Sequence, residues 1–192
     1  MKKIGLFFGS FNPIHGGHLA VAEFFAESTP LEEVWLVVSP QSPFKQQTDL
    51  MDNHHRLAMV QLAIEGKPKL KACDDEFNLP QPNYTIDTLV YLKKKYADHQ
   101  FTLLLGADNL SGLERWRSYK QILEGFEIFV YPRSQTTERS KLLDHAKIHF
   151  FDAPLIEISA TAIRDAMKKN EAIDGWLSAP IQDYIQKFNL NL

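Results

Sequence analysis

Short apolar runs recur along the chain, separated by segments in which apolar side chains return at helical spacing. Each run is bounded by Gly, Pro or polar residues and is too short for a helix, which predicts buried strands. The six predicted strands span residues 4–8, 34–38, 70–73, 101–105, 126–131 and 148–151. Nearly continuous apolar strands are typical of a sheet that is covered on both faces.

Between the strands, the apolar pattern predicts helices. In the first of them Leu19, Ala22 and Phe25 fall on one helical face. The predicted helices span 19–27, 52–64, 85–96, 118–123, 161–169 and 180–188, with a short helix closing at 142–145. The expected loops span 39–51, 74–83 and 106–109. Asp52 is the expected N-cap of the second helix, because its carboxylate suits the unpaired N–H groups there.

Alternating strands and helices predict an α/β fold, a doubly wound and mostly parallel sheet with helices on both faces. Ligands of such sheets bind beyond the carboxyl ends of the strands, near the point where strand order reverses. The segments 9–18, 39–40, 106–108 and 132–133 all follow predicted strands. We therefore expect them to meet at one edge of the sheet. No internal repeat or linker interrupts the chain, which predicts a single domain over 1–192.

The turn at residues 9–18, Gly-Ser-Phe-Asn-Pro-Ile-His-Gly-Gly-His, joins a predicted strand to a predicted helix. Its glycines let the backbone approach a ligand closely, and the helix N-terminus favours anions. His15 and His18 add further donors, so the turn predicts a site for phosphate chemistry. A capping pair or a metal-binding pair is the alternative, although zinc needs three or four ligands and no such cluster lies nearby.

A second cluster, Ile-Ser-Ala-Thr-Ala-Ile-Arg at residues 158–164, begins a predicted helix near the C-terminus. Ser159 or Thr161 is a suitable N-cap. Hydroxyls, unpaired N–H groups and the Arg164 guanidinium together predict a second cradle for phosphate. A capped helix with an exposed arginine is the plainer interpretation.

Composition narrows the class of protein. Of the 192 residues, 44% are apolar and 23% are charged, which is typical of a globular domain. The net charge of −3 and the lack of a dense Lys/Arg block predict no general affinity for nucleic acid. The single Cys73 excludes an internal disulfide. No apolar stretch approaches the roughly 20 residues of a membrane span, so a cytoplasmic protein is expected.

The two clusters together resemble the nucleotidyltransferases of the His-x-Gly-His type. Over nearly its whole length the chain is similar to the bacterial nicotinate mononucleotide adenylyltransferases, through residues 39–45, 83–89 and 106–110 and through Trp116. Phe44 departs from the pattern of related sequences, which often place Pro-His before the basic residue. The resemblance implies a Rossmann-like nucleotidyltransferase fold whose C-terminal helices, 161–188, complete the phosphate site.

The resemblance also implies the reaction: adenylyl transfer from ATP to nicotinate mononucleotide, giving nicotinic acid adenine dinucleotide and pyrophosphate in NAD biosynthesis. Mg²⁺ would be carried with ATP, and no protein metal ligands are expected. The implied catalytic residues are His15, His18 and Arg164. The implied ATP-binding residues are Gly9, Ser10, Phe11, His18, Gly106, Asp108, Ile158, Ser159, Thr161 and Arg164. The implied mononucleotide-binding residues are Asn12, Lys45, Tyr84, Thr85 and Trp116.

Each of these roles has a structural alternative. Asp108 would otherwise cap its loop, Lys45 would be a solvated lysine, and Trp116 would belong to the core. Tyr84 and Thr85 would simply begin a helix, capped by Asn83 or Thr85.

Other functions fit part of the pattern. A related adenylyltransferase acting on nicotinamide mononucleotide or on phosphopantetheine is the alternative enzyme, although phosphopantetheine needs no stacking tryptophan. Class I aminoacyl-tRNA synthetases share the His-x-Gly-His signature, but this chain is short and lacks a Lys-Met-Ser-Lys-Ser segment. A non-catalytic nucleotide sensor could lose one phosphate cradle, whereas both are present here. The sequence does not settle the oligomeric state.

Overall fold

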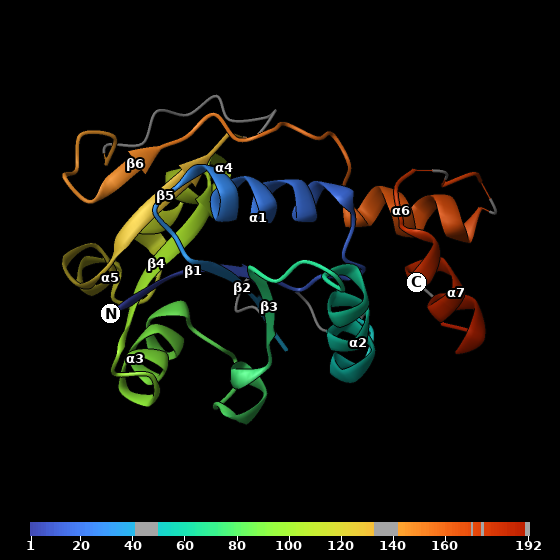
Figure 1. Ribbon diagram of the computed structural model, residues 1–192, viewed down its shortest axis with the longest axis horizontal. Helices are drawn as coiled ribbons and strands as arrows, with labels where there is room; N and C mark the ends of the chain where they lie inside the picture. Colours follow the sequence, from blue (N-terminus) through green and yellow to red (C-terminus); the bar gives the residue numbers. More distant parts are fainter. Residues whose placement is uncertain (41–49, 133–141, 170, 174, 191–192) are drawn as a thin grey trace.

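Six parallel strands form one sheet at the centre of the protein (Figure 1). The structure is a computed structural model that describes residues 1–40, 50–132, 142–169, 171–173 and 175–190. The strands are β1 (Lys2–Gly9), β2 (Glu33–Val38), β3 (Leu70–Cys73), β4 (His99–Gly106), β5 (Glu127–Tyr131) and β6 (Ile148–Phe150). They follow the order β3-β2-β1-β4-β5-β6, which is the doubly wound arrangement. Strand order therefore reverses between β1 and β4.

Helices cover both faces of this sheet. The α-helices are α1 (Gly16–Ser28), α2 (Asn53–Ala63), α3 (Thr85–Lys95), α4 (Ala107–Ser111), α5 (Tyr119–Gly125), α6 (Ala160–Lys168) and α7 (Ala179–Lys187). Short 3₁₀ segments lie at η2 (Asp75–Asn78) and η3 (Leu113–Arg115). No helix in the described ranges is long and apolar enough to cross a membrane.

The buried side chains form two clusters, one on each face of the sheet. One joins α1, α2, α6 and α7 to the sheet and contains Phe25, Met59, Ile163 and Ile181. The other joins α3, α4 and α5 to the opposite face. In Figure 1, α1 and α3 accordingly lie on opposite sides of the strands. Alternating side chains of the central strands feed both clusters, which explains their continuous apolar runs.

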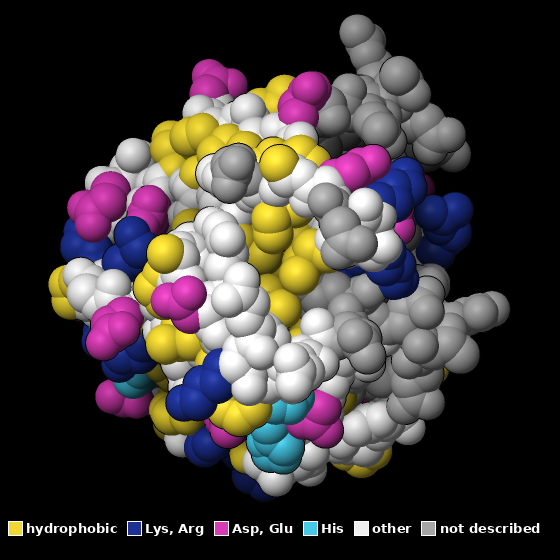
Figure 2. Space-filling model, turned by 90° about the vertical axis from the view of Figure 1, so that its right-hand side faces the viewer, with side chains coloured by type: hydrophobic (Ala, Val, Ile, Leu, Met, Phe, Trp, Pro, Cys, Tyr) yellow, Lys and Arg dark blue, Asp and Glu magenta, His cyan; other side chains and the backbone are white. Residues whose placement is uncertain are grey.

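The C-terminal helices pack at one end of the molecule, where α7 contacts α2. His55 Nδ1 lies 3.0 Å from the Tyr184 hydroxyl across this contact. Figure 2 views this end of the molecule, with hydrophobic side chains near the centre and charged ones mainly toward the periphery. The segment just before α7 also contacts the first turn of α1, because Gly16 N–H donates to the carbonyl of Trp176 at 3.4 Å.

Several predicted elements were wrong in detail. The expected loop 74–83 contains the 3₁₀ segment η2, and the expected loop 106–109 is instead the start of the short helix α4 with its N-cap Gly106. The predicted short helix at 142–145 is a turn. Asn83 and Thr85 do not cap α3, whose N-cap is Tyr84 without a side-chain bond. The Asp52 cap is confirmed, with its carboxylate 2.8 Å from His54 N.

Arg56 of α2 is fully buried and connects the ends of two strands. Its Nη1 donates to the carbonyls of Ser10 at 2.6 Å and Ser39 at 2.8 Å. Its Nε donates to the carbonyl of Met51 at 3.0 Å. Burial lowers the pKa of Arg56 to about 10, so the guanidinium still carries its charge at neutral pH. One cation thus holds three backbone segments together at the carboxyl edge of the sheet.

We expect Arg56→Met to lower the free energy of unfolding by at least about 3 kcal/mol, because it leaves several buried carbonyls without a donor. Arg56→Lys should recover only part of the loss, since an ammonium group cannot reproduce the planar fork. Urea unfolding of both variants measures the effect, with Arg115→Met at an exposed arginine as the control. Equal stability of Arg56→Met and wild type would contradict this assignment.

Candidate active site

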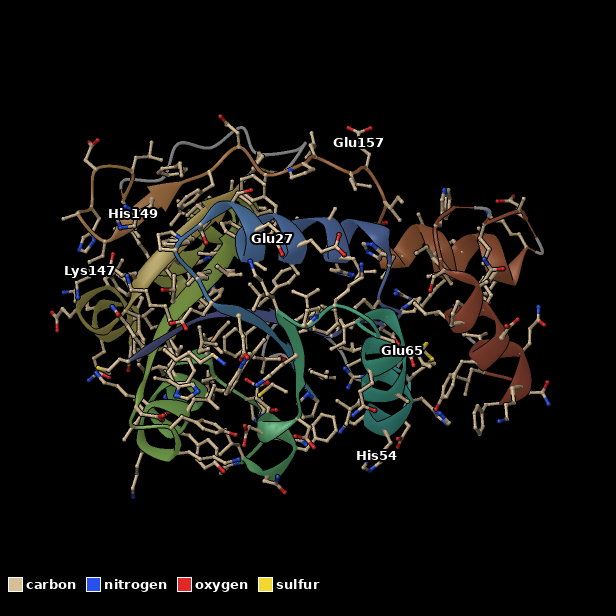
Figure 3. The ribbon with its side chains drawn as sticks, in the orientation of Figure 1. Glu27, His54, Glu65, Lys147, His149 and Glu157 are labelled. Carbon is tan, nitrogen blue, oxygen red and sulfur yellow. The ribbon has the colours of Figure 1, made fainter. Side chains whose placement is uncertain are left out.

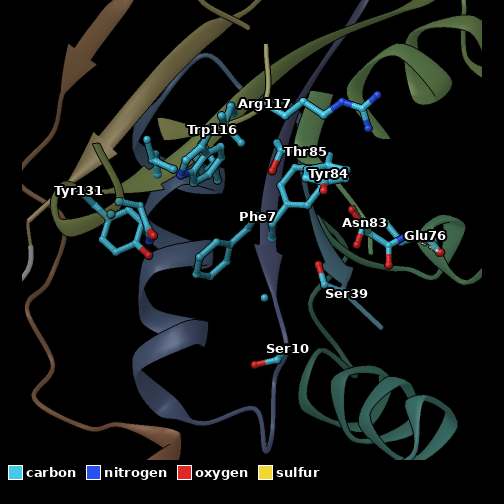
Figure 4. A pocket seen from close by; sticks show the side chains of 17 residues that line it. Phe7, Ser10, Ser39, Glu76, Asn83, Tyr84, Thr85, Trp116, Arg117 and Tyr131 are labelled. Atoms are coloured by element: carbon cyan, nitrogen blue, oxygen red, sulfur yellow. Dashed lines mark hydrogen bonds between the residues drawn. The ribbon is translucent and has the colours of Figure 1, made fainter. Parts of the chain in front are cut away.

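A cleft of about 300 Å³ opens at the carboxyl ends of β1 and β4, where the strand order reverses. The described residues that line it include Phe7, Gly9, Ser10, Ser39, Glu76, Asn83, Tyr84, Thr85, Gly106, Asn109, Trp116, Arg117 and Tyr131. Figure 4 shows Trp116, Arg117, Thr85 and Tyr84 toward one end of the cleft and Ser10 at the other. Trp116 is half-buried: it packs against the second core cluster and also lines the cleft.

A smaller hollow of about 20 Å³ adjoins the cleft. It is lined by His15, Gly17 and His18 from the start of α1 and by Ile156 and Ile158 from the segment before α6. Phe7 and Tyr131 line both hollows, with their rings 5.9 Å apart. The cleft and the histidine hollow are therefore neighbours that share two aromatic walls.

His15 and His18 stack on each other, with ring centroids 3.7 Å apart. His15 N–H donates to Nδ1 of His18 at 3.4 Å, so in the neutral ring of His18 the proton lies on Nε2. The ring of Phe11 packs edge-on against His18 at 5.1 Å. These contacts fix the orientation of His18. No group of three or more His, Cys, Asp or Glu that could hold a metal occurs in the described part of the chain.

The start of α6 lies against the same turn. Ser159 caps the helix, because its Oγ accepts from Ala162 N at 3.1 Å. Arg164 Nη1 donates to the carbonyl of Asn12 at 2.8 Å, and Nη2 lies 3.3 Å from Thr161 Oγ1. The two sequence clusters are therefore in direct contact, although 152 positions separate Arg164 from Asn12.

Two glycines at the carboxyl edge of the sheet leave room for neighbouring side chains to pack against the backbone. A Cβ on Gly9 would lie 2.8 Å from the ring of Phe11, which is buried and has a φ of 44° in the left-handed region. A Cβ on Gly106 would lie 2.4 Å from Oδ1 of Asp108. Phe11, 1% exposed, is thus part of the core, and its ring lies against Gly9.

A buried carboxyl group lies in the wall of the cleft. Glu76, 2% exposed, accepts from Thr88 Oγ1 at 2.6 Å, and its backbone carbonyl accepts from Asn83 Nδ2 at 3.1 Å. Burial raises the pKa of Glu76, and hydrogen bonds from Thr88 and Ser39 oppose this shift. Glu76 therefore ties the end of β2 and the segment η2 to the start of α3.

The structure distributes the residues expected from sequence over these features. The cleft takes Gly9, Ser10, Gly106, Tyr84, Thr85 and Trp116, and the smaller hollow takes His15, His18 and Ile158. Six further residues line neither hollow: Phe11, Asn12, Asp108, Ser159, Thr161 and Arg164. Arg164 contacts Asn12 and Thr161, and Asp108 lies beside Gly106 of the cleft. Asn12 is buried, and its side-chain oxygen accepts from Met51 N at 3.1 Å. Lys45 lies outside the described residues.

Sequence reasoning missed several residues of the cleft. Phe7 lies near the end of β1 and Tyr131 at the end of β5, and a place close to the carboxyl edge was the signal that could have found them. Glu76 and Asn83 belong to a segment predicted as loop, where no pattern marks a buried group. Other histidines lie elsewhere: His54 is on α2 and His149 is on β6, away from the cleft (Figure 3).

Comparison with known proteins identifies the family. A family model described as cytidylyltransferase-like matches residues 6–166. A protein of Flavobacterium johnsoniae, described as a probable nicotinate-nucleotide adenylyltransferase, is 48% identical over 188 residues, 97% of each chain. The chain belongs to this adenylyltransferase family. A second member, from Christiangramia forsetii, is 47% identical over 189 residues. The match covers 98% of this chain and 97% of the Christiangramia protein.

Solved structures agree with this adenylyltransferase fold. A nicotinic acid mononucleotide adenylyltransferase of Plasmodium falciparum, complexed with NaAD, superposes with a TM-score of 0.83. The alignment covers 100% of this chain and 98% of that chain at 22% identity. The predicted Rossmann-like nucleotidyltransferase fold is confirmed.

The raised pKa of Glu76 predicts a pH effect on the stability of this adenylyltransferase. The Glu76 carboxyl binds its proton more tightly in the folded protein than in the unfolded chain. The folded protein therefore loses stability as pH rises from the pKa of the unfolded chain, about 4.3, toward the pKa of the folded state. We therefore expect wild type to lose stability relative to Glu76→Gln across that window, and the difference to level off above it. Urea unfolding at a series of pH values tests this, with Glu114→Gln at an exposed glutamate as the control. Parallel curves for Glu76→Gln and wild type would exclude the effect.

Proposed function

We propose that the cleft and the histidine hollow bind nicotinate mononucleotide and ATP side by side, and that the chain transfers the adenylyl group between them. Nicotinate-nucleotide adenylyltransferase activity in NAD biosynthesis is the activity of its family. The observation that carries the proposal is the junction of the two hollows at Phe7 and Tyr131. In the proposal, this junction brings the ring of the mononucleotide close to the phosphates of ATP.

The reaction needs placement and charge stabilisation more than acid–base chemistry. A phosphate oxygen of the mononucleotide attacks the α-phosphorus of ATP, the bond from that phosphorus to the bridging oxygen breaks, and pyrophosphate leaves. The attacking phosphate is already an anion, so no general base is required. The protein must hold the reacting groups in line and stabilise the charge that grows on the phosphate oxygens.

His15 and His18 support the α-phosphate in this proposal. The Nε2–H of His18 is a donor whose direction is fixed by stacking on His15 and by the bond to Nδ1. Such a preorganised donor strengthens its hydrogen bond as charge develops in the transition state.

The β- and γ-phosphates belong at the start of α6. Ser159 and Thr161 supply hydroxyls beside the helix N-terminus, and Arg164 supplies a guanidinium that uses only part of its five N–H donors on Asn12 and Thr161. Mg²⁺ would arrive on the phosphate oxygens of ATP and keep several of its waters. In this way α6 completes the phosphate site.

The adenosine end uses the carboxyl edge of the sheet. Gly9, Ser10 and Gly106 line the cleft, where a nucleotide can approach their backbone closely, and the buried ring of Phe11 packs against Gly9. The exposed carboxylate of Asp108, beside Gly106, would accept from a ribose hydroxyl. Ile158 would supply apolar contact from the adjoining hollow.

The mononucleotide takes the other end of the cleft. Its pyridinium ring would stack on Trp116, since a cation over an indole gains about 0.5–2 kcal/mol. Its ring carboxylate would accept from backbone N–H groups where α3 begins, at Tyr84 and Thr85. Asn12 fixes the turn between β1 and α1, because its side-chain oxygen accepts from Met51 N and its backbone carbonyl accepts from Arg164.

Incubation with ATP, Mg²⁺ and each acceptor, followed by pyrophosphate release, tests the proposal. We expect kcat/KM for nicotinate mononucleotide to exceed that for nicotinamide mononucleotide at least about tenfold, because a carboxamide leaves backbone donors unpaired at about 1–3 kcal/mol each.

Trp116→Ala should raise KM for both acceptors and leave their ratio unchanged. Equal use of both acceptors by wild type would refute the donor-only subsite, and ATP binding without turnover would indicate a nucleotide sensor.

His18→Ala should lower kcat by about 10²–10³, the usual cost of removing one preorganised donor to a transition state. The side chain is partly exposed, so the variant should remain folded, which circular dichroism verifies. Steady-state kinetics under saturating ATP and mononucleotide measure the loss. A folded variant that turns over at the wild-type rate would eliminate this role for His18.

A further inference from the structure

Arg117 lies where the ring platform meets the start of α3. It lines the cleft together with Tyr84 and Thr85, and it directly follows Trp116 in the chain. Its Cζ is 4.8 Å from the centroid of the Tyr84 ring, and its Nη1 is 3.2 Å from Oδ2 of Asp87 in the first turn of α3. Figure 4 shows Arg117, Thr85 and Tyr84 at the same end of the cleft.

This arginine contributes little to the stability of the fold. The side chains of Arg117 and Asp87 are 57% and 54% exposed, and ion pairs as exposed as this one are screened by water and salt. Stacking on Tyr84 and the bond to Asp87 nevertheless hold the guanidinium in one place. A positive charge therefore lies beside a helix N-terminus, which itself favours an anion.

We propose that Arg117 is a specificity-determining residue that favours an anionic ring substituent on the acceptor. This inference rests on the proposed function, because it concerns the ring carboxylate of nicotinate mononucleotide. The two candidate acceptors carry the same phosphate, ribose and pyridinium ring, and they differ by one negative charge on the substituent. The attraction of Arg117 for the phosphate therefore cancels in the ratio of kcat/KM values, and the ratio isolates its effect on the substituent.

Asp87 opposes this selection. It neutralises part of the Arg117 charge and places a negative charge near the same end of the cleft. Removing the Asp87 charge should therefore change the acceptor ratio in the opposite direction from removing Arg117. Such a pair of opposite effects distinguishes a charge effect from simple damage to the cleft wall.

Steady-state kinetics of the full-length protein with ATP, Mg²⁺ and each mononucleotide test the proposal. Arg117→Ala should lower the preference for nicotinate over nicotinamide mononucleotide about three- to tenfold, through a larger rise in KM for the nicotinate compound than for the nicotinamide compound. Asp87→Asn should raise the preference. High salt should reduce the effect of Arg117, because the charge is exposed.

Arg115→Ala is the matched control, since it removes the same charge from an exposed residue that does not line the cleft. It should leave the ratio at the wild-type value. The proposal would be overturned by an unchanged ratio in Arg117→Ala, by an equal fall in Arg115→Ala, or by a fall in Asp87→Asn. In each of these cases turnover by wild type would still uphold the proposed function. Absence of turnover by wild type with either acceptor would instead remove the proposed function itself.

Discussion

The architecture of the site depends on one buried positive charge. Parallel strands end in backbone that turns away from the sheet, and its carbonyl groups must find donors when water is excluded. Arg56 supplies these donors to Ser10 after β1, to Ser39 after β2 and to Met51 before α2. The guanidinium is buried at a cost in solvation, and that cost is offset by several charge-assisted bonds from a single planar group. The backbone just after β1, just after β2 and just before α2 is consequently held together by one side chain.

The floor of the site is apolar and its rim is polar, and both follow from the order of the strands. β1 and β4 are neighbours whose connections leave in opposite directions, which opens the cleft between them. Phe7 near the end of β1 and Tyr131 at the end of β5 form the wall that the cleft and the smaller hollow share. Donors concentrate at both ends, with the start of α3 at one and the start of α6 at the other. In the proposed reaction, the ring carboxylate and the phosphates of ATP would each meet one of these helix starts.

Local sequence predicted what local chemistry determines. The apolar runs located all six strands, with β3 matched at both ends, and Asp52 and Ser159 cap their helices as polar side chains at those positions should. The local sequence around Arg56 indicates only a solvated arginine in a helix. Its partners are carbonyls at the ends of two strands, which are distant in the sequence. Glu76 was missed for the same reason: its partners Ser39 and Thr88 come from other elements. The five residues of α4 are too few to display a helical period.

The contact between Arg164 and Asn12 also has a consequence for biosynthesis of the protein. A nascent chain leaves the ribosome from its N-terminus, and domains begin to fold while synthesis continues. By the time β6 has emerged, every strand of the sheet is available, yet the turn after β1 still lacks α6 and the carbonyl of Trp176. An assembly intermediate at that stage exposes His15 and His18 without the segment that covers them. Nucleotide bound at the completed site would therefore stabilise the arrangement in which α6 and the segment around Trp176 pack against the turn after β1.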